Sequence, residues 1–159
     1  MRFFITVCLV YMMLVGIVSQ SVWAQAQAPK RSETSARAVV GGVFSPEAYR
    51  GKSAVLLFFW TTWCPYCREE LKGLKDQQAA LTTAGVELAI INVGESVGQV
   101  SRFVEKLGLS SPVYLDEDQS LADQYRVMGV PTFILIGKDG TELTRDNAFP
   151  LDYKKRIVS

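Results

Sequence analysis

The sequence predicts an α/β fold in which a mixed central sheet carries helices on both faces. The first observation is an unbroken apolar run at residues 54–60, which is too short to span a membrane and is typical of a strand buried on both faces. The second is the alternation of helical and strand patterns that follows this run. The third is a hairpin pattern around a Lys-Asp-Gly turn at residues 138–140, which adds an antiparallel strand.

The N-terminal residues have the pattern of a secretory signal. Arg2 precedes an apolar run at residues 3–18, and small residues lead to a cleavage position after Ala24. We therefore expect residues 1–24 to be a signal peptide and the protein to be exported to the periplasm or another extracytoplasmic space, with an uncleaved membrane anchor as the alternative. Residues 25–40 are polar and small and predict a flexible tether, and residues 41–159 form one domain.

The elements of this domain follow one another in a regular order. A short edge strand is expected at residues 39–44, followed by a helical turn that begins with Pro46. After the buried strand, the patterns predict a helix from Cys67 to Gly85, a strand at 86–93, a helix at 97–107, a strand at 112–115, a helical turn near Leu121 and Tyr125, a hairpin of 133–136 with 141–143, and a short helix after Pro150.

Two cysteines separated by two residues lie where the buried strand ends and the first long helix begins. Cys64 is expected at the helix N-terminus, where free N–H groups favour a thiolate, and Cys67 lies one turn on, within reach of a disulfide bond. A purely structural disulfide is a poor alternative because the loop it closes is very short. A zinc site needs further ligands, but the sequence has no histidine, and the third cysteine, Cys8, lies in the signal segment. A redox-active pair is the interpretation we adopt, with no metal and no other cofactor.

Several motifs together resemble one known family. They are Trp63-Cys64-x-x-Cys67, the segment Asn92-Val93-Gly94-Glu95-Ser96, and Gly129-Val130-Pro131-Thr132 just before a strand. The sequence resembles the TlpA/ResA branch of the thioredoxin superfamily, which is related to the AhpC/TSA redoxins. This resemblance covers residues 44–147 and implies a thioredoxin fold with the extra helix and strand of the TlpA type. Its N-terminal hairpin and C-terminal helix are shorter here than in the family.

The resemblance assigns roles to the residues of the redox motif. It implies that Cys64 is the exposed nucleophile and forms the mixed disulfide that Cys67 resolves. Client proteins are expected to contact Trp63, Pro65 and Tyr66.

The residues just before the predicted strand at 133–136 supply the other half of the expected site. By resemblance, Pro131 follows a cis peptide bond, so that the backbone of Val130 lies beside Cys64 and pairs with an extended substrate. An ordinary turn proline is the alternative for Pro131.

Proton transfer to Cys67 requires an acid–base group. Thioredoxins carry a buried aspartate six residues before the first cysteine, and that position is Phe58 here. Glu70 matches an acidic position of ResA-like proteins and lies on the helix face of Cys67, so we expect it to exchange protons with the thiols. A solvated carboxylate that interacts with the helix dipole is the alternative.

The predicted function is an exported thiol–disulfide oxidoreductase that reduces disulfides of partner proteins, as in cytochrome c maturation or envelope redox homeostasis. The resemblance implies client proteins and a membrane-bound electron donor as partners. We expect a monomer, and a net charge of +1 gives no basis for nucleic-acid binding. The alternatives are a DsbA-like oxidase, a client-binding module without catalysis, and a peroxiredoxin-type peroxidase, whose motif would need a proline in place of Leu57.

Overall fold

The structure is a computed structural model, and it describes residues 36–38, 43–109 and 111–158. The predicted signal peptide, Cys8 and most of the predicted tether lie outside the described residues. Among the described residues, no helix combines the length and the apolar character that crossing a membrane requires.

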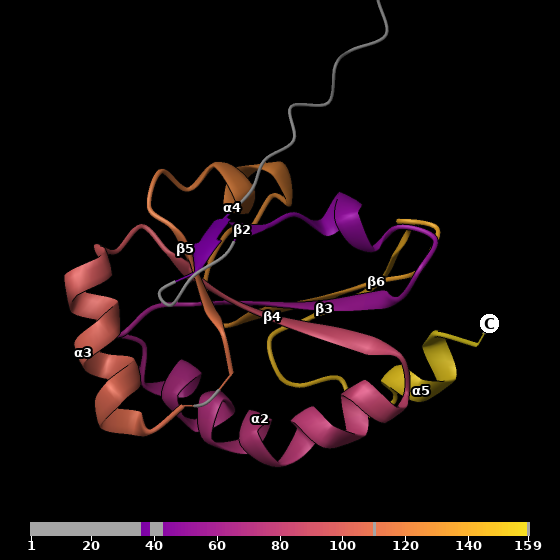
Figure 1. Cartoon of the computed structure of the whole chain (residues 1–159), viewed down its shortest axis with the longest axis horizontal. Coiled ribbons are helices and arrows are strands. Elements are labelled where there is room, and N and C mark those ends of the chain that lie inside the picture. The colour runs from indigo at the N-terminus through magenta and orange to yellow at the C-terminus, as the bar shows by residue number, and fades with distance from the viewer. Residues whose placement is uncertain (1–35, 39–42, 110, 159) are drawn as a thin grey trace, which may run out of the picture. The chain divides into compact units, whose positions relative to one another are not determined.

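A seven-stranded mixed sheet forms the centre of the domain, in the order β2-β1-β5-β4-β3-β6-β7 (Figure 1). The central strand β3 pairs in parallel with β4 and antiparallel with β6, and β4 continues in parallel to β5. The strands are β1 (Ala36–Ala38), β2 (Val43–Phe44), β3 (Ala54–Trp60), β4 (Val86–Val93), β5 (Val113–Asp116), β6 (Thr132–Ile136) and β7 (Glu142–Asp146). The mixed sheet predicted from the sequence is confirmed.

Helices cover both faces of this sheet. They are the 3-10 turn η1 (Pro46–Tyr49) and the α-helices α2 (Pro65–Thr83), α3 (Val97–Leu107), α4 (Ser120–Gln124) and α5 (Tyr153–Arg156). Figure 1 shows α2, α3 and α5 on one side of β3 and β4, and η1 and α4 on the other. Between β4 and β6 the chain forms α3, β5 and α4, which include the additional helix and strand implied by the resemblance.

Strand β3 lies at the centre of the hydrophobic core. Its side chains point alternately into two apolar clusters, one on each face of the sheet. Phe58 and Trp60 belong to the cluster under α2 and α3, whereas Leu57 and Phe59 belong to the cluster under η1 and α4. All residues of β3 are buried, as the unbroken apolar run predicted. Phe58 stacks on Phe133 of β6 with 4.3 Å between the ring centroids. A rigid strand therefore delivers the chain to the turn that precedes Cys64.

The boundary of the predicted tether is wrong. Ala36–Ala38 lie within the predicted tether of residues 25–40, but they form β1, which pairs antiparallel with both β5 and β2. The predicted edge strand at 39–44 is described only at Val43–Phe44. A short edge strand is held by backbone hydrogen bonds to its neighbour, so it needs no apolar periodicity, and the composition of this segment gave no sign of it.

The acidic start of the β5–α4 connection has a structural role. The Asp116 carboxylate accepts hydrogen bonds from the backbone N–H groups of Leu121 and Ala122, at 2.9 and 2.8 Å. The side chain is buried, and this burial raises the pKa of the Asp116 carboxyl above its ordinary value of 3.8, although the two backbone hydrogen bonds lower it. Asp116 thus fixes the start of α4.

Candidate active site

The redox motif lies where β3 ends and α2 begins. Cys64 is the N-cap residue of α2, and Pro65 occupies the first turn, where its missing N–H costs no hydrogen bond. Cys64 and Cys67 form a disulfide, with their Cα atoms 5.3 Å apart. The backbone N–H of Cys67 donates to Cys64 Sγ at 3.2 Å. The helix N-terminus therefore presents an N–H group to this sulfur and favours its negatively charged form after reduction.

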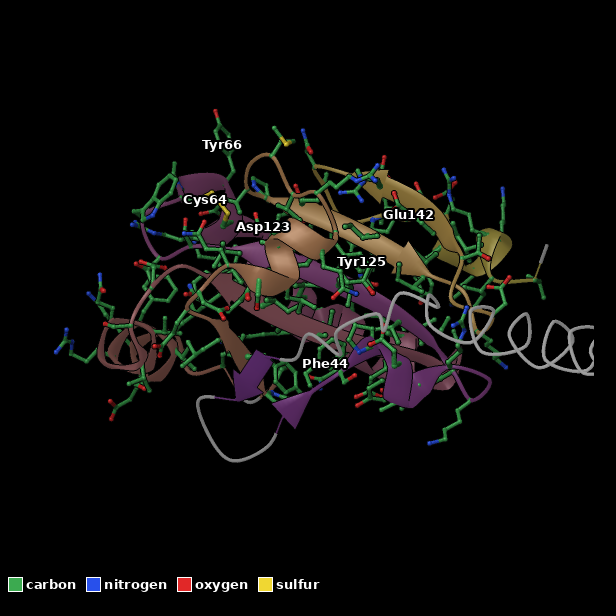
Figure 2. All side chains as sticks on the ribbon, turned by 90° about the horizontal axis from the view of Figure 1, so that it is seen from above. Phe44, Cys64, Tyr66, Asp123, Tyr125 and Glu142 are labelled. Carbon is green, nitrogen blue, oxygen red and sulfur yellow. A yellow bond between two sulfur atoms is a disulfide. The ribbon has the colours of Figure 1, made fainter. Side chains whose placement is uncertain are left out.

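Both sulfurs lie within the protein, which corrects the expectation of an exposed nucleophile. The exposed fraction is 3% for Cys64 and 0% for Cys67. The flanking side chains are the exposed ones, at 68% for Trp63 and 75% for Tyr66, and Pro65 is also exposed. Figure 2 shows Tyr66 pointing away from the protein beside Cys64. A partner would contact these side chains before it reached the disulfide.

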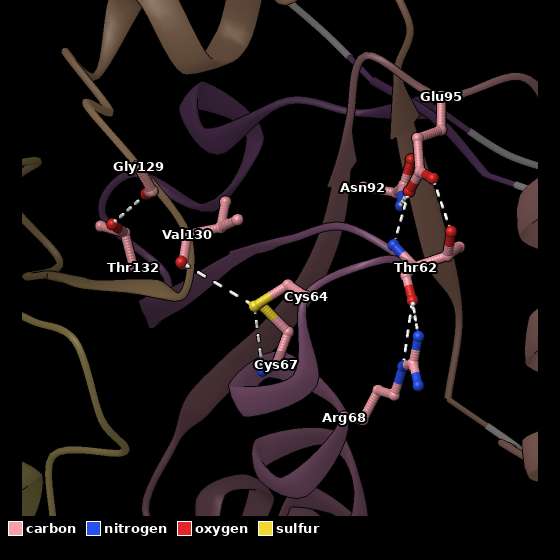
Figure 3. Close-up of a disulfide and its surroundings, with 9 residues drawn as sticks. All are labelled: Thr62, Cys64, Cys67, Arg68, Asn92, Glu95, Gly129, Val130 and Thr132. Atoms are coloured by element: carbon pink, nitrogen blue, oxygen red, sulfur yellow. Dashed lines mark hydrogen bonds between the residues drawn. A yellow bond between two sulfur atoms is a disulfide. The ribbon is translucent and has the colours of Figure 1, made fainter.

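The loop before β6 lies against the disulfide. The Val130–Pro131 peptide bond is cis, and the carbonyl oxygen of Val130 lies 3.8 Å from Cys64 Sγ (Figure 3). The Thr132 hydroxyl donates to the carbonyl of Gly129 at 2.7 Å and closes the loop on itself. The structure therefore brings Val130 to Cys64, as the resemblance implied.

A buried carboxylate, Glu95, holds the turn between β3 and Cys64. It accepts hydrogen bonds from the backbone N–H and the hydroxyl of Thr62, both at 2.6 Å, and from the Asn92 amide at 2.7 Å (Figure 3). Glu95 is only 8% exposed and Asn92 is fully buried. On the other side, the carbonyl of Thr62 accepts two hydrogen bonds from the Arg68 guanidinium, at 3.1 and 2.9 Å. That guanidinium lies over the Phe103 ring, 5.8 Å from its centroid. Thr62 is therefore fixed from two directions.

Neither Glu95 nor Arg68 was among the predicted site residues. Asn92 carried a usable signal, because a buried amide at the end of an apolar strand needs a hydrogen-bond partner nearby. Glu95 belongs to the motif at residues 92–96 that supports the resemblance.

The predicted acid–base residue lies one turn beyond the disulfide. Glu70 is half-buried on α2, and no described residue hydrogen-bonds to its carboxylate. Its neighbour Glu69 is exposed and pairs with Lys72 at 2.8 Å. Phe58 fills the position of the thioredoxin aspartate with a fully buried ring. In the described part of the chain, no group of three or more acidic or cysteine side chains is placed to hold a metal ion.

Comparison with known proteins identifies the family. The AhpC/TSA family model matches residues 24–141. The thiol-disulfide oxidoreductase ResA of Bacillus subtilis is 40% identical over 91 residues, which is 57% of this chain and 50% of ResA. The soluble secreted antigen MPT53 of Mycobacterium bovis is 32% identical over 120 residues, which is 76% of this chain and 68% of MPT53. The chain thus spans about half the length of the ResA proteins it matches.

Solved structures give the same result for the fold. A secreted disulfide oxidoreductase of Mycobacterium tuberculosis, described as homologous to Escherichia coli DsbE, is 29% identical with a TM-score of 0.66, and the match covers 82% of this chain and 98% of that protein. StoA of Bacillus subtilis, at 23% identity and a TM-score of 0.67 over 79% of this chain and 96% of StoA, supports the fold alone. The chain belongs to the AhpC/TSA family, has its thioredoxin-like α/β fold, and carries a Cys-x-x-Cys pair like thiol-disulfide oxidoreductases of the ResA and DsbE type.

Proposed function

We propose that this protein is an exported thiol–disulfide oxidoreductase that reduces disulfides in partner proteins through Cys64 and Cys67. The observation that carries the proposal is the disulfide at the start of α2, with the N–H of Cys67 on one side of Cys64 Sγ and the carbonyl of Val130 on the other. Relatives that are named thiol-disulfide oxidoreductases support the reaction class.

The reaction begins with the reduced pair. The Cys64 thiolate attacks one sulfur of the client disulfide, forms a mixed disulfide, and releases the other client sulfur as a thiolate that takes up a proton. The Cys67 thiolate then attacks Cys64 Sγ and releases the second client thiol. Two electrons pass to the client, its two thiols take one proton from the Cys67 thiol and one from solvent, and the Cys64–Cys67 disulfide forms. Glu70 is our candidate for the group that accepts the Cys67 proton before the second step.

Client binding uses the exposed side chains around the disulfide. Trp63 and Tyr66 flank Cys64 and offer large apolar contacts, and Met128 of the loop before β6 is 96% exposed. Residues of this kind are favoured where one surface must accept varied partners. The backbone of Val130 and Pro131 supports an extended client segment beside the disulfide.

The direction of electron flow and the location complete the proposal. Two relatives are described as secreted, which supports removal of residues 1–24 during export and a function outside the cytoplasm. A membrane-bound electron donor would then reduce the Cys64–Cys67 disulfide again. We propose that the protein acts as a monomer. Cytochrome c maturation and general envelope redox homeostasis are the candidate pathways.

The reduction potential of the Cys64–Cys67 pair tests this proposal. The full chain is equilibrated in dithiothreitol or glutathione buffers, and its tryptophan fluorescence, to which Trp60 and Trp63 near the disulfide contribute, reports the redox state. The Cys64→Ser variant is the blank. A potential near that of thioredoxin, about −270 mV, supports a reductase. A potential of about −120 mV would make the protein a DsbA-like oxidase. Absence of any exchange would refute the enzyme and leave a client-binding module.

A further inference from the structure

A pocket of about 380 Å³ adjoins the redox centre on the side of β6 and β7. Val130 lines this pocket with its loop neighbours, and the carbonyl of Val130 lies 3.8 Å from Cys64 Sγ. A client segment that pairs with the loop would therefore place a neighbouring side chain here. Its lining residues include Arg126, Met128, Val130, Pro131 and Arg145.

The pocket carries one positive charge without a counter-charge. Arg145 donates to both carboxylate oxygens of Glu142, at 2.9 and 2.8 Å, and to the carbonyl of Tyr125 at 2.8 Å. Glu142 also lines the adjoining pocket, where Arg145 engages both of its oxygens. Arg126 lines both pockets and is exposed, and no described residue forms a hydrogen bond or ion pair with its guanidinium. A ligand that enters here meets the free charge of Arg126.

The backbone of Arg126 closes the C-terminus of α4. Its φ of 51° is in the left-handed region, directly after the C-cap of α4. The hydrogen bonds from Arg126 N to Asp123 O and from Val127 N to Ala122 O close the end of this helix. Glycine is the favoured residue at such a position because any side chain is strained there. Glycine can therefore replace Arg126 without disturbing this backbone.

We propose that this pocket is a specificity site for an acidic side chain of the client, next to the client cysteine that Cys64 attacks. The carboxylate of a client Asp or Glu would pair with Arg126, while Met128 contacts the apolar part of the same segment. This inference rests on the proposed function, because it needs a client segment on the Val130–Pro131 loop. Arg126 is then a determinant of which disulfides are reduced.

Peptides of matched sequence test the inference. Each contains one cysteine as a mixed disulfide with thionitrobenzoate, flanked by Glu, Gln or Lys, and is mixed with the reduced full chain. Attack of the Cys64 thiolate on the peptide sulfur releases the coloured thionitrobenzoate anion, and Cys67 then releases the peptide thiol. We expect the Glu peptide to react roughly fivefold faster than the Lys peptide, and this preference to fall as salt is added.

Two charge reversals locate the preference. Arg126→Glu is expected to reverse the order of the peptides. Lys138→Glu makes the same change of net charge beyond Ile136, at the end of β6 remote from Pro131, and is expected to keep the wild-type order. A Lys138→Glu effect equal to that of Arg126→Glu would show a general charge effect and overturn the proposal.

A third variant separates the side chain from the fold. Arg126→Gly suits the left-handed backbone, so its unfolding midpoint is expected to be no lower than that of the wild type, while the preference for the Glu peptide is lost. Retention of the preference in Arg126→Gly would overturn the specificity site. Equal rates for all peptides in the wild type would also overturn it and leave the proposed function intact, whereas no release from any peptide would refute the proposed function itself.

Discussion

Replacing Glu95 with alanine is expected to destabilise the domain by about 3–5 kcal/mol. The carboxylate accepts three hydrogen bonds of 2.6 to 2.7 Å, and a hydrogen bond to a charged group contributes about 1.5–3 kcal/mol. The three contributions do not simply add, because Thr62 is half-buried and its freed groups can bind water. Asn92 is fully buried, and its amide N–H would be left without an acceptor, so it accounts for the largest part of the loss.

Urea denaturation of the oxidised protein measures this loss. Glu95→Gln is the matched variant, since its amide oxygen can still accept from the Thr62 N–H and from Asn92, and its NH2 group can donate to the Thr62 hydroxyl. We expect it to lose only about 1 kcal/mol, the difference between charged and neutral hydrogen bonds. Glu105→Ala, at an exposed position of α3, is the control and is expected to change stability by less than about 0.5 kcal/mol.

The same variants test whether the carboxylate positions the redox turn. Glu95→Ala loosens the segment that leads from Thr62 to Cys64, so the reduced variant should react more slowly with a peptide disulfide under conditions where it is fully folded. Glu95→Gln should react at nearly the wild-type rate. If Glu95→Ala lost less than about 1 kcal/mol of stability, the three short hydrogen bonds would not hold the turn as we argue.

Three further expectations follow from the site. Cys67→Ser should accumulate a mixed disulfide between Cys64 and a client on a non-reducing gel, because the resolving thiol is absent, and a variant without an adduct would contradict the assigned order of attack. Burial raises the pKa of the Asp116 carboxyl above 3.8, so its contribution to stability is complete below that pH and is lost as the pH rises through the raised pKa. Asp116→Asn should therefore cost more stability at about pH 3 than at about pH 7 in urea titrations, and the reverse trend would refute the sign. Glu70→Gln should change the pH profile of thiol exchange, whereas Glu69→Gln, whose carboxylate pairs with Lys72 in solvent, should not; identical profiles would remove Glu70 from the mechanism.

The sequence predicted those parts of the fold that have a regular spacing of apolar residues or a residue that marks the end of a helix. Strand β4 has the predicted bounds of 86–93, and α3 has those of 97–107, with Gly108 in the left-handed conformation at its end. The disulfide was expected from the two-residue spacing and the helix start alone. In each case the information lies within a few neighbouring residues.

Features that depend on distant partners were missed. Strand β1 exists because β5 offers an edge to pair with, and the acid at Asp116 is buried because α4 folds back over it. By contrast, the contact of Cys64 with Val130, 66 residues away in the chain, was expected, but only from the family resemblance. No local pattern carries such information, and only the register of the sheet connects these residues.

That register explains why three connections meet at Cys64. Strands β3 and β4 are parallel with Trp60 opposite Asn92, so the residues that follow each strand leave the sheet at the same edge, and Thr62 meets Glu95. Strand β6 is antiparallel to β3 with Thr132 opposite Phe59, so the residues that precede β6 arrive at that edge, and Val130 meets Cys64. A shift of one residue in either pairing would turn the apolar side chains of β3 to the wrong cluster and would separate a partner from the redox turn. The apolar pattern that stabilises the core thus also fixes the geometry of the disulfide, and the two cannot vary independently.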